Sequence, residues 1–197
     1  VDALGLEKPF GVGHSKGAAS LLLAEQARPG TFRALYLFEP VVVPTDFVTE
    51  HNPDNPLSNG ARRRRDTFAS FDEAFDNYAS KPPFNTLHPD VLRVYVDHGF
   101  TENTDGTVSL KCLPENEAEV YAHGMSHHAF ASLHDVSCPV TIAMGVENAV
   151  PAVFGRKIAE ALPNGTVASF PELAHFGPLE DPSTIASSIL DSFSTVE

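Results

Sequence analysis

Short apolar runs alternate with stretches of helical periodicity toward both ends of the chain. The apolar runs predict buried strands, at residues 10–13, 34–38, 140–144 and 167–170. The periodic stretches predict helices, at residues 16–28, 153–162 and 182–193. Strand and helix alternation of this kind predicts an α/β fold with a mostly parallel sheet flanked by helices.

The middle of the chain has no comparable strand run. Proline, asparagine and glycine at residues 53–60 predict an irregular loop, and Ser70-x-x-Glu73 is a capping box that predicts a helix start. Further helices are expected from residue 89 and over residues 115–133. We therefore predict three segments, listed as core 1–44, helical insertion 45–135 and core 136–197.

The net charge and the cysteine content limit the classes of binding partner and the compartment that we expect. The net charge of -13 argues against binding to nucleic acid or to an anionic membrane, and no apolar run approaches the roughly 20 residues of a membrane span. The basic run Arg62 to Arg65 is expected to be a solvated helix start. Cys112 and Cys138 are too few for a disulfide framework, with Cys138 expected to be buried, which favours a reducing, cytoplasmic location.

The sequence Gly-His-Ser-Lys-Gly at residues 13–17 lies between a predicted strand and a predicted helix. Glycines on both sides permit a tight turn that exposes the Ser15 hydroxyl, and the following helix directs its first amides to the same point. We expect Ser15 to be a nucleophile. His14, inside the turn, is expected to pack beside it.

A serine nucleophile needs a base, and a carboxylate to orient that base. His175 lies in a loop between the last predicted strand and the last helix. In a parallel sheet this loop falls at the carboxyl edge, where Ser15 also lies. No cofactor or metal is predicted, since His127 and His128 lack companions at metal-ligand spacing.

The turn at 13–17, the segment Leu-Phe-Glu-Pro at 37–40 and the segment Leu-Ala-His-Phe-Gly-Pro at 173–178 together resemble the alpha/beta-hydrolase family. The resemblance covers nearly the whole chain outside the insertion. It implies a serine hydrolase in which the insertion is a lid. These motifs are specific to a fold rather than to a substrate.

The position of the acid is open. The family usually places an aspartate after the penultimate strand, where this chain has Glu147 and Asn148 instead. Part of the family, including some haloalkane dehalogenases, carries a glutamate after the strand that follows the nucleophile helix, and Glu39 matches that position. A carboxylate at the end of an apolar strand is costly unless it is paired, so we favour Glu39 over Glu147. The alternative is a structural glutamate bonded to loop amides.

The family also has several strands before the nucleophile turn, and one of their loops supplies half of the oxyanion hole. This chain begins shortly before the turn, so we expect an N-terminally truncated sequence in which the amide of Lys16 is one oxyanion donor.

The resemblance and the serine predict hydrolysis of a small, hydrophobic carboxylic ester through an acyl-enzyme. The oligomeric state is not predicted. The alternative is a non-catalytic relative that binds a small ligand. Five phenylalanines of the insertion are candidates to line an apolar pocket or to pack within the insertion: Phe68, Phe71, Phe75, Phe84 and Phe130.

Overall fold

The computed structural model describes residues 1–146 and 152–196 of the chain. It forms two compact units. The core unit comprises Val1–Thr49 and Met125–Glu197, and the insert unit comprises Glu50–Gly124. Each is described by itself below.

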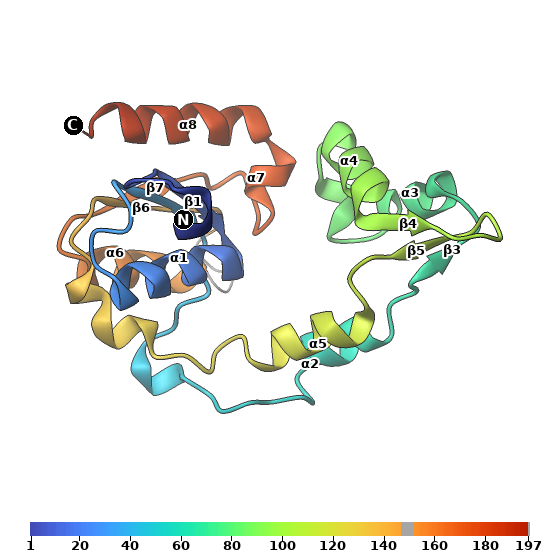
Figure 1. Cartoon of the computed structure of the whole chain (residues 1–197), viewed down its shortest axis with the longest axis horizontal. Helices are drawn as coiled ribbons and strands as arrows, with labels where there is room; N and C mark the ends of the chain where they lie inside the picture. The colour runs from blue at the N-terminus through green and yellow to red at the C-terminus, as the bar shows by residue number, and fades with distance from the viewer. Residues whose placement is uncertain (147–151, 197) are drawn as a thin grey trace. The chain divides into compact units, whose positions relative to one another are not determined.

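A parallel sheet forms the centre of the core unit (Figure 1). Its strand order is β1-β2-β6-β7, and each neighbouring pair is parallel. The strands are β1 (Gly11–His14), β2 (Leu35–Phe38), β6 (Val140–Met144) and β7 (Gly165–Ser169). The predicted parallel sheet is confirmed.

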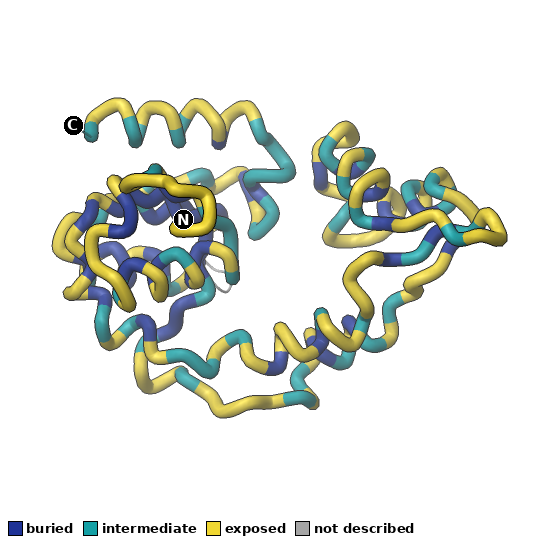
Figure 2. Tube along the Cα trace, in the orientation of Figure 1, coloured by how far each residue is buried: buried dark blue, intermediate teal, exposed yellow. Residues whose placement is uncertain are grey.

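Helices cover both faces of this sheet (Figure 1). Helices α1 (Ser15–Ala27) and α6 (Gly155–Ala161) pack on one face, and α8 (Pro182–Ser194) packs on the other. Leu35 and Leu37 of β2 therefore face one apolar layer, while Tyr36 and Phe38 face the other. This two-sided cover explains why β2 is apolar at every position. Figure 2 shows the central strands β2 and β6 largely buried, whereas more than half of α8 is exposed.

Short helical turns join these elements. They are α7 (Gly177–Glu180) and the 3-10 helices η1 (Asp2–Leu4), η2 (Thr45–Phe47), η4 (Ala129–Asp135) and η5 (Ala152–Phe154).

The insert unit is mainly helical. Its helices are α2 (Pro56–Arg62), α3 (Phe71–Ala79), α4 (Pro89–Gly99) and α5 (Pro114–Ala122), with the 3-10 turn η3 (Phe84–Thr86). It also holds an antiparallel sheet of order β3-β5-β4, formed by β3 (Thr67–Phe68), β5 (Val108–Leu110) and β4 (Phe100–Glu102). This small sheet was not predicted, because strands of two or three residues carry no readable periodicity.

Two local predictions in the insertion are wrong. The loop expected at 53–60 contains α2, because the Asn55 side chain caps the helix by accepting the amides of Leu57 and Ser58, and Pro56 occupies its first position. The single helix expected over 115–133 ends at Ala122, before Gly124, and η4 follows separately. In contrast, the helix start predicted after Ser70 is confirmed, with its hydroxyl accepting the amide of Glu73 at 3.1 Å.

The basic run is also not the solvated helix start that we expected. Helix α2 ends at Arg62, so the run follows a helix. The half-buried guanidinium of Arg64 donates to the Glu117 carboxylate and to the hydroxyls of Tyr78 and Tyr95. Arg64 therefore links α3, α4 and α5 within the insert unit.

The state of the two cysteines and the character of the described helices are two further features. Cys138 is buried as expected, Cys112 is exposed, and both are free thiols. Among the described helices, none has both the length and the apolar character needed to cross a bilayer.

Candidate active site

Ser15 lies at the junction between β1 and α1. Its backbone φ is 54°, in the left-handed region that a serine rarely adopts. The turn requires glycine at position 13, because a Cβ there would lie 2.7 Å from the Cα of Ala18. The sequence thus folds locally into a tight strand-to-helix turn that presents the serine side chain.

His175 reaches Ser15 from the loop between β7 and α7. Its Nε2 lies 3.0 Å from the Ser15 Oγ. The loop is fixed from both sides, since the amide of Ala174 donates to the Glu180 carboxylate and the amide of Gly177 donates to the Ala174 carbonyl, both at 2.9 Å. The imidazole is therefore held in place by the backbone that carries it.

Glu39 follows β2 directly, with a φ of 43°. Its side chain is almost completely buried, and its Oε2 lies 2.6 Å from the Nδ1 of His175. Its Oε1 accepts the amide of Gly145 at 2.9 Å. These two hydrogen bonds offset the cost of burying a carboxylate.

The three side chains form one hydrogen-bonded series at the carboxyl edge of the parallel sheet. A carboxylate only accepts hydrogen bonds, so Nδ1 of His175 carries the proton and Nε2 is left to accept from the Ser15 hydroxyl. The structure therefore brings Ser15, His175 and Glu39 together. Lys16, whose amide is the expected oxyanion donor, follows Ser15 in the first turn of α1. Glu147 and Asn148 lie outside the described residues.

Comparison with known proteins identifies the fold. E-2-(acetamidomethylene)succinate hydrolase matches with a TM-score of 0.77, 19% identity, 98% of this chain and 69% of its own. The peroxisomal alpha-beta-hydrolase Lpx1 of Saccharomyces cerevisiae matches with a TM-score of 0.76, 22% identity, 94% of this chain and 53% of its own. The chain has the alpha/beta-hydrolase fold.

A third solved structure, the thioesterase domain from the curacin biosynthetic pathway, matches with a TM-score of 0.64 and 18% identity over 94% of this chain and 66% of its own. The chain thus spans between 53% and 69% of the length of these three hydrolase-fold proteins. No protein-family model matches the sequence, and no curated protein matches it in sequence.

His14 makes a contact in this hydrolase-fold turn that the sequence did not reveal. Its Nε2 donates to the backbone carbonyl of His175 at 2.7 Å, and the two rings lie 4.8 Å apart between centroids. Burial and the neighbouring His175 lower the pKa of the His14 imidazole, so His14 is neutral at pH 7. It therefore holds the loop of His175 without adding a charge.

A second histidine, His127, supports the turn through Val41. The amide of Val41 donates to the Ser15 carbonyl at 3.2 Å, and Nε2 of His127 donates to the Val41 carbonyl at 2.8 Å. Burial lowers the pKa of the His127 imidazole and that of the Lys16 amine. The backbone at Ser15 is thus fixed by the Val41 amide and, through Val41, by the His127 ring.

Two cavities and three of the five candidate phenylalanines can be located among the described residues. Two cavities of about 340 and 610 Å³ occur in the core unit, and none of Ser15, Glu39 and His175 lines either. Phe68 and Phe84 pack on Tyr78 within the insert unit, and Phe130 packs against the core of the hydrolase-fold sheet. For these three phenylalanines, packing is the role that the contacts support.

Proposed function

We propose that the chain is a serine hydrolase that cleaves a small carboxylic ester through an acyl-enzyme. The observation that carries the proposal is the uninterrupted series Ser15 Oγ, His175 Nε2, His175 Nδ1 and Glu39 Oε2, with contacts of 3.0 and 2.6 Å. A serine hydroxyl is a poor nucleophile alone and is activated by an oriented base of this kind.

In the acylation step, the Ser15 oxygen attacks the ester carbonyl carbon while its proton moves to Nε2 of His175. The carbonyl electron pair moves onto the carbonyl oxygen and gives a tetrahedral oxyanion. When that intermediate collapses, the imidazolium returns its proton to the departing alkoxide, which leaves as an alcohol. The product is an ester between Ser15 and the acyl group.

Glu39 stabilises the imidazolium that forms during attack. It stays ionised throughout, because it serves as an acceptor for the Nδ1 proton and for the Gly145 amide. The amide of Lys16, in the first turn of α1, supplies one hydrogen bond to the oxyanion, where the helix N-terminus also favours negative charge.

In the deacylation step, His175 takes a proton from water, whose oxygen attacks the acyl carbon. Collapse of the second intermediate returns the proton to the Ser15 oxygen and releases a carboxylic acid. Hydrolysis therefore consumes one water and needs no cofactor in this sequence of steps.

The surroundings of His175 support an apolar acyl group. The ring of Phe176 lies edge-on to that of His175, with the ring centroids 5.5 Å apart. Two of the similar structures are described as an E-2-(acetamidomethylene)succinate hydrolase and as a thioesterase domain. A short ester or thioester is the substrate class that we propose.

The test combines covalent labelling with turnover. A fluorophosphonate should attach to Ser15, located by peptide mass spectrometry, and p-nitrophenyl acetate and butyrate should be hydrolysed. Ser15→Ala should abolish labelling and lower kcat by about 10⁴-fold or more. Ser187→Ala is the matched control, since its hydroxyl bonds a helix carbonyl on α8 and lies outside the proposed mechanism.

Labelling at another residue, or equal turnover by Ser15→Ala, would overturn the serine mechanism. Reversible binding of the esters with neither labelling nor turnover would instead support the alternative, a non-catalytic protein that binds a small ligand.

A further inference from the structure

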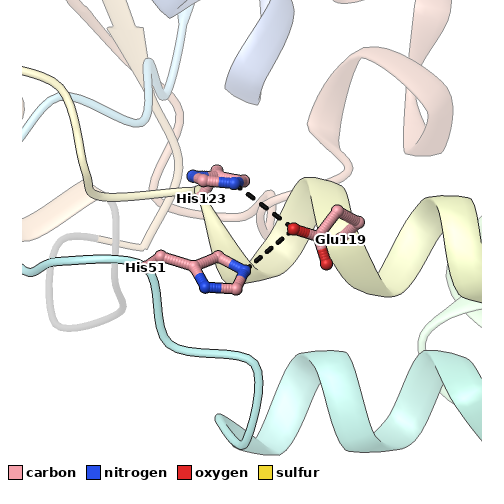
Figure 3. A group of neighbouring side chains, drawn as sticks. All are labelled: His51, Glu119 and His123. Carbon is pink, nitrogen blue, oxygen red and sulfur yellow. Dashed lines mark hydrogen bonds and ion pairs between the residues drawn. The ribbon is translucent and has the colours of Figure 1, made fainter.

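Three metal-ligating side chains converge in the insert unit, which contains none of the residues of the proposed serine mechanism. His51, Glu119 and His123 place one ligand atom each within 4.8 Å of the others (Figure 3). Nε2 of His51 lies 2.8 Å from Oε1 of Glu119, and Nε2 of His123 lies 3.3 Å from the same oxygen. Among the described residues, this is the one such cluster of three.

The spacing at the carboxyl end of α5, where His123 follows the last helical residue, accounts for two of the three ligands. Glu119 and His123 are four residues apart, which places them on one face of the helix at its carboxyl end. His51 comes from the segment that precedes α2, and its ring lies 4.4 Å from that of His123 between centroids. Residues far apart in the sequence thus meet at one point.

The backbone beneath these side chains is fixed by hydrogen bonds. The amide of Asn52 donates to the Ala122 carbonyl at 3.0 Å, and the buried hydroxyl of Ser58 donates to the Ala118 carbonyl at 2.8 Å. The side-chain amide of Asn55 also donates to the Tyr121 carbonyl at 3.3 Å. The ligand residues are therefore brought together whether or not an ion is bound.

We propose that His51, Glu119 and His123 bind a divalent transition-metal ion of the zinc type. Two imidazole nitrogens and one carboxylate oxygen are a donor set that suits zinc, cobalt and nickel better than magnesium or calcium. Zinc bonds of about 2.0–2.1 Å in a tetrahedron separate the ligand atoms by about 3.3 Å. The present separations are 2.8 and 3.3 Å from the Glu119 oxygen to the two imidazole nitrogens, with all three atoms within 4.8 Å of one another, so side-chain rotations suffice to reach that value.

The exposure of the cluster determines the kind of site. The three side chains are 42%, 51% and 53% exposed, so water completes the fourth position. A bound ion ties the segment before α2 to the end of α5. The expected consequence is a more stable insert unit, because binding to the folded state alone shifts the folding equilibrium.

The experiment uses the full chain without a histidine tag, with zinc chloride in calorimetry and cobalt chloride in absorption spectroscopy. One zinc per chain should bind, and cobalt should give the intense visible bands of a tetrahedral site. His51→Ala should weaken zinc binding by more than about tenfold, as the loss of a ligand does at least as much as the loss of a supporting residue. His134→Ala is the matched control, an exposed histidine 3.4 Å from a carboxylate of Asp135 but outside the cluster.

Thermal unfolding provides a second readout. Zinc should raise the unfolding temperature of the unmodified chain and of His134→Ala, and should leave that of His51→Ala unchanged. Circular dichroism without metal checks that both variants are folded. Equal zinc affinity in the chain and in His51→Ala, or equal weakening in both variants, would overturn the site. The serine mechanism is unaffected by either result.

Discussion

Two carboxylates are buried among the described residues, and their surroundings differ in one respect. Glu25, at 0% exposure in α1, accepts the amides of Gly30 at 2.7 Å and Phe32 at 3.0 Å with its two oxygens. Glu39, at 2% exposure after β2, accepts one amide and one imidazole. Burial alone therefore does not separate a carboxylate that holds a turn from one that lies at the candidate site.

The bonding partner separates them. Both oxygens of Glu25 are taken by the loop that follows its helix, so this side chain holds a turn in place. One oxygen of Glu39 is anchored by Gly145, and the other is directed to a ring that contacts the Ser15 hydroxyl. The same chemical group thus fixes a loop in one region and holds the imidazole beside Ser15 in the other.

The first prediction concerns catalysis and carries the largest effect. Glu39→Gln should lower kcat on p-nitrophenyl butyrate by about 10⁴-fold, because an amide in place of the carboxylate favours the wrong imidazole tautomer and no longer stabilises the imidazolium. Glu25→Gln should leave kcat within about twofold of the unmodified chain, since its contacts lie outside the mechanism. Steady-state kinetics measures both. A similar loss of kcat in the two variants would contradict the difference that we predict between these residues.

The second prediction concerns the free energy of unfolding, for which Glu25 rather than Glu39 is the residue with the expected effect. Glu25→Gln should lower the free energy of unfolding by about 1–3 kcal/mol, because one of the two loop amides then faces an NH2 group and is left without an acceptor. Urea unfolding measures the change. Glu160→Gln, at an exposed position on α6, is the control and should change stability by less than about 0.5 kcal/mol. An equally small effect at Glu25 would show that its burial contributes nothing to the turn.

The sequence contained enough information for the core sheet and for the positions of the proposed site residues. Strands β2 and β6 are apolar at nearly every position because both faces are covered, which is a strong local signal. Parallel topology then places the ends of β1, β2 and β7 at one edge, and this predicts that Ser15, Glu39 and His175 are neighbours. Their catalytic roles stay predictions.

The remaining features depend on contacts between residues far apart in the sequence, which local sequence patterns do not reveal. The bond from His14 to the carbonyl of His175 joins residues 161 positions apart. The metal-ligand cluster depends on the pairing of Asn52 with Ala122. Glu25 did leave a signal, since it shares the apolar face of α1 with Ala18 and Leu22, and a charge at such a position predicts a buried, bonded carboxylate.

The smallest expected effect is on the pH dependence of stability, and it arises from two half-buried histidines, His14 and His127. Burial lowers the pKa values of His14 and His127 below the ordinary 6.5, and each ring donates to a backbone carbonyl. Below pH 6.5 the unfolded chain therefore binds more protons at these positions than the folded chain. The stability that they contribute is complete above pH 6.5 and is lost as pH falls through that value toward the lower folded pKa values.

The measurement is the free energy of unfolding in urea between pH 5 and pH 8, for the unmodified chain and for the double variant His14→Gln, His127→Gln. A glutamine amide can replace each Nε2 donor without titrating. The variant should lose less stability than the unmodified chain between pH 7 and pH 5.5, with a difference of about 1 kcal/mol. His98→Gln, which replaces an exposed histidine, should keep the slope of the unmodified chain. If the double variant kept the same slope of unfolding free energy against pH, the rings of His14 and His127 would not be the groups that take up protons on unfolding. The loss of stability at acid pH would then have to come from the carboxylates.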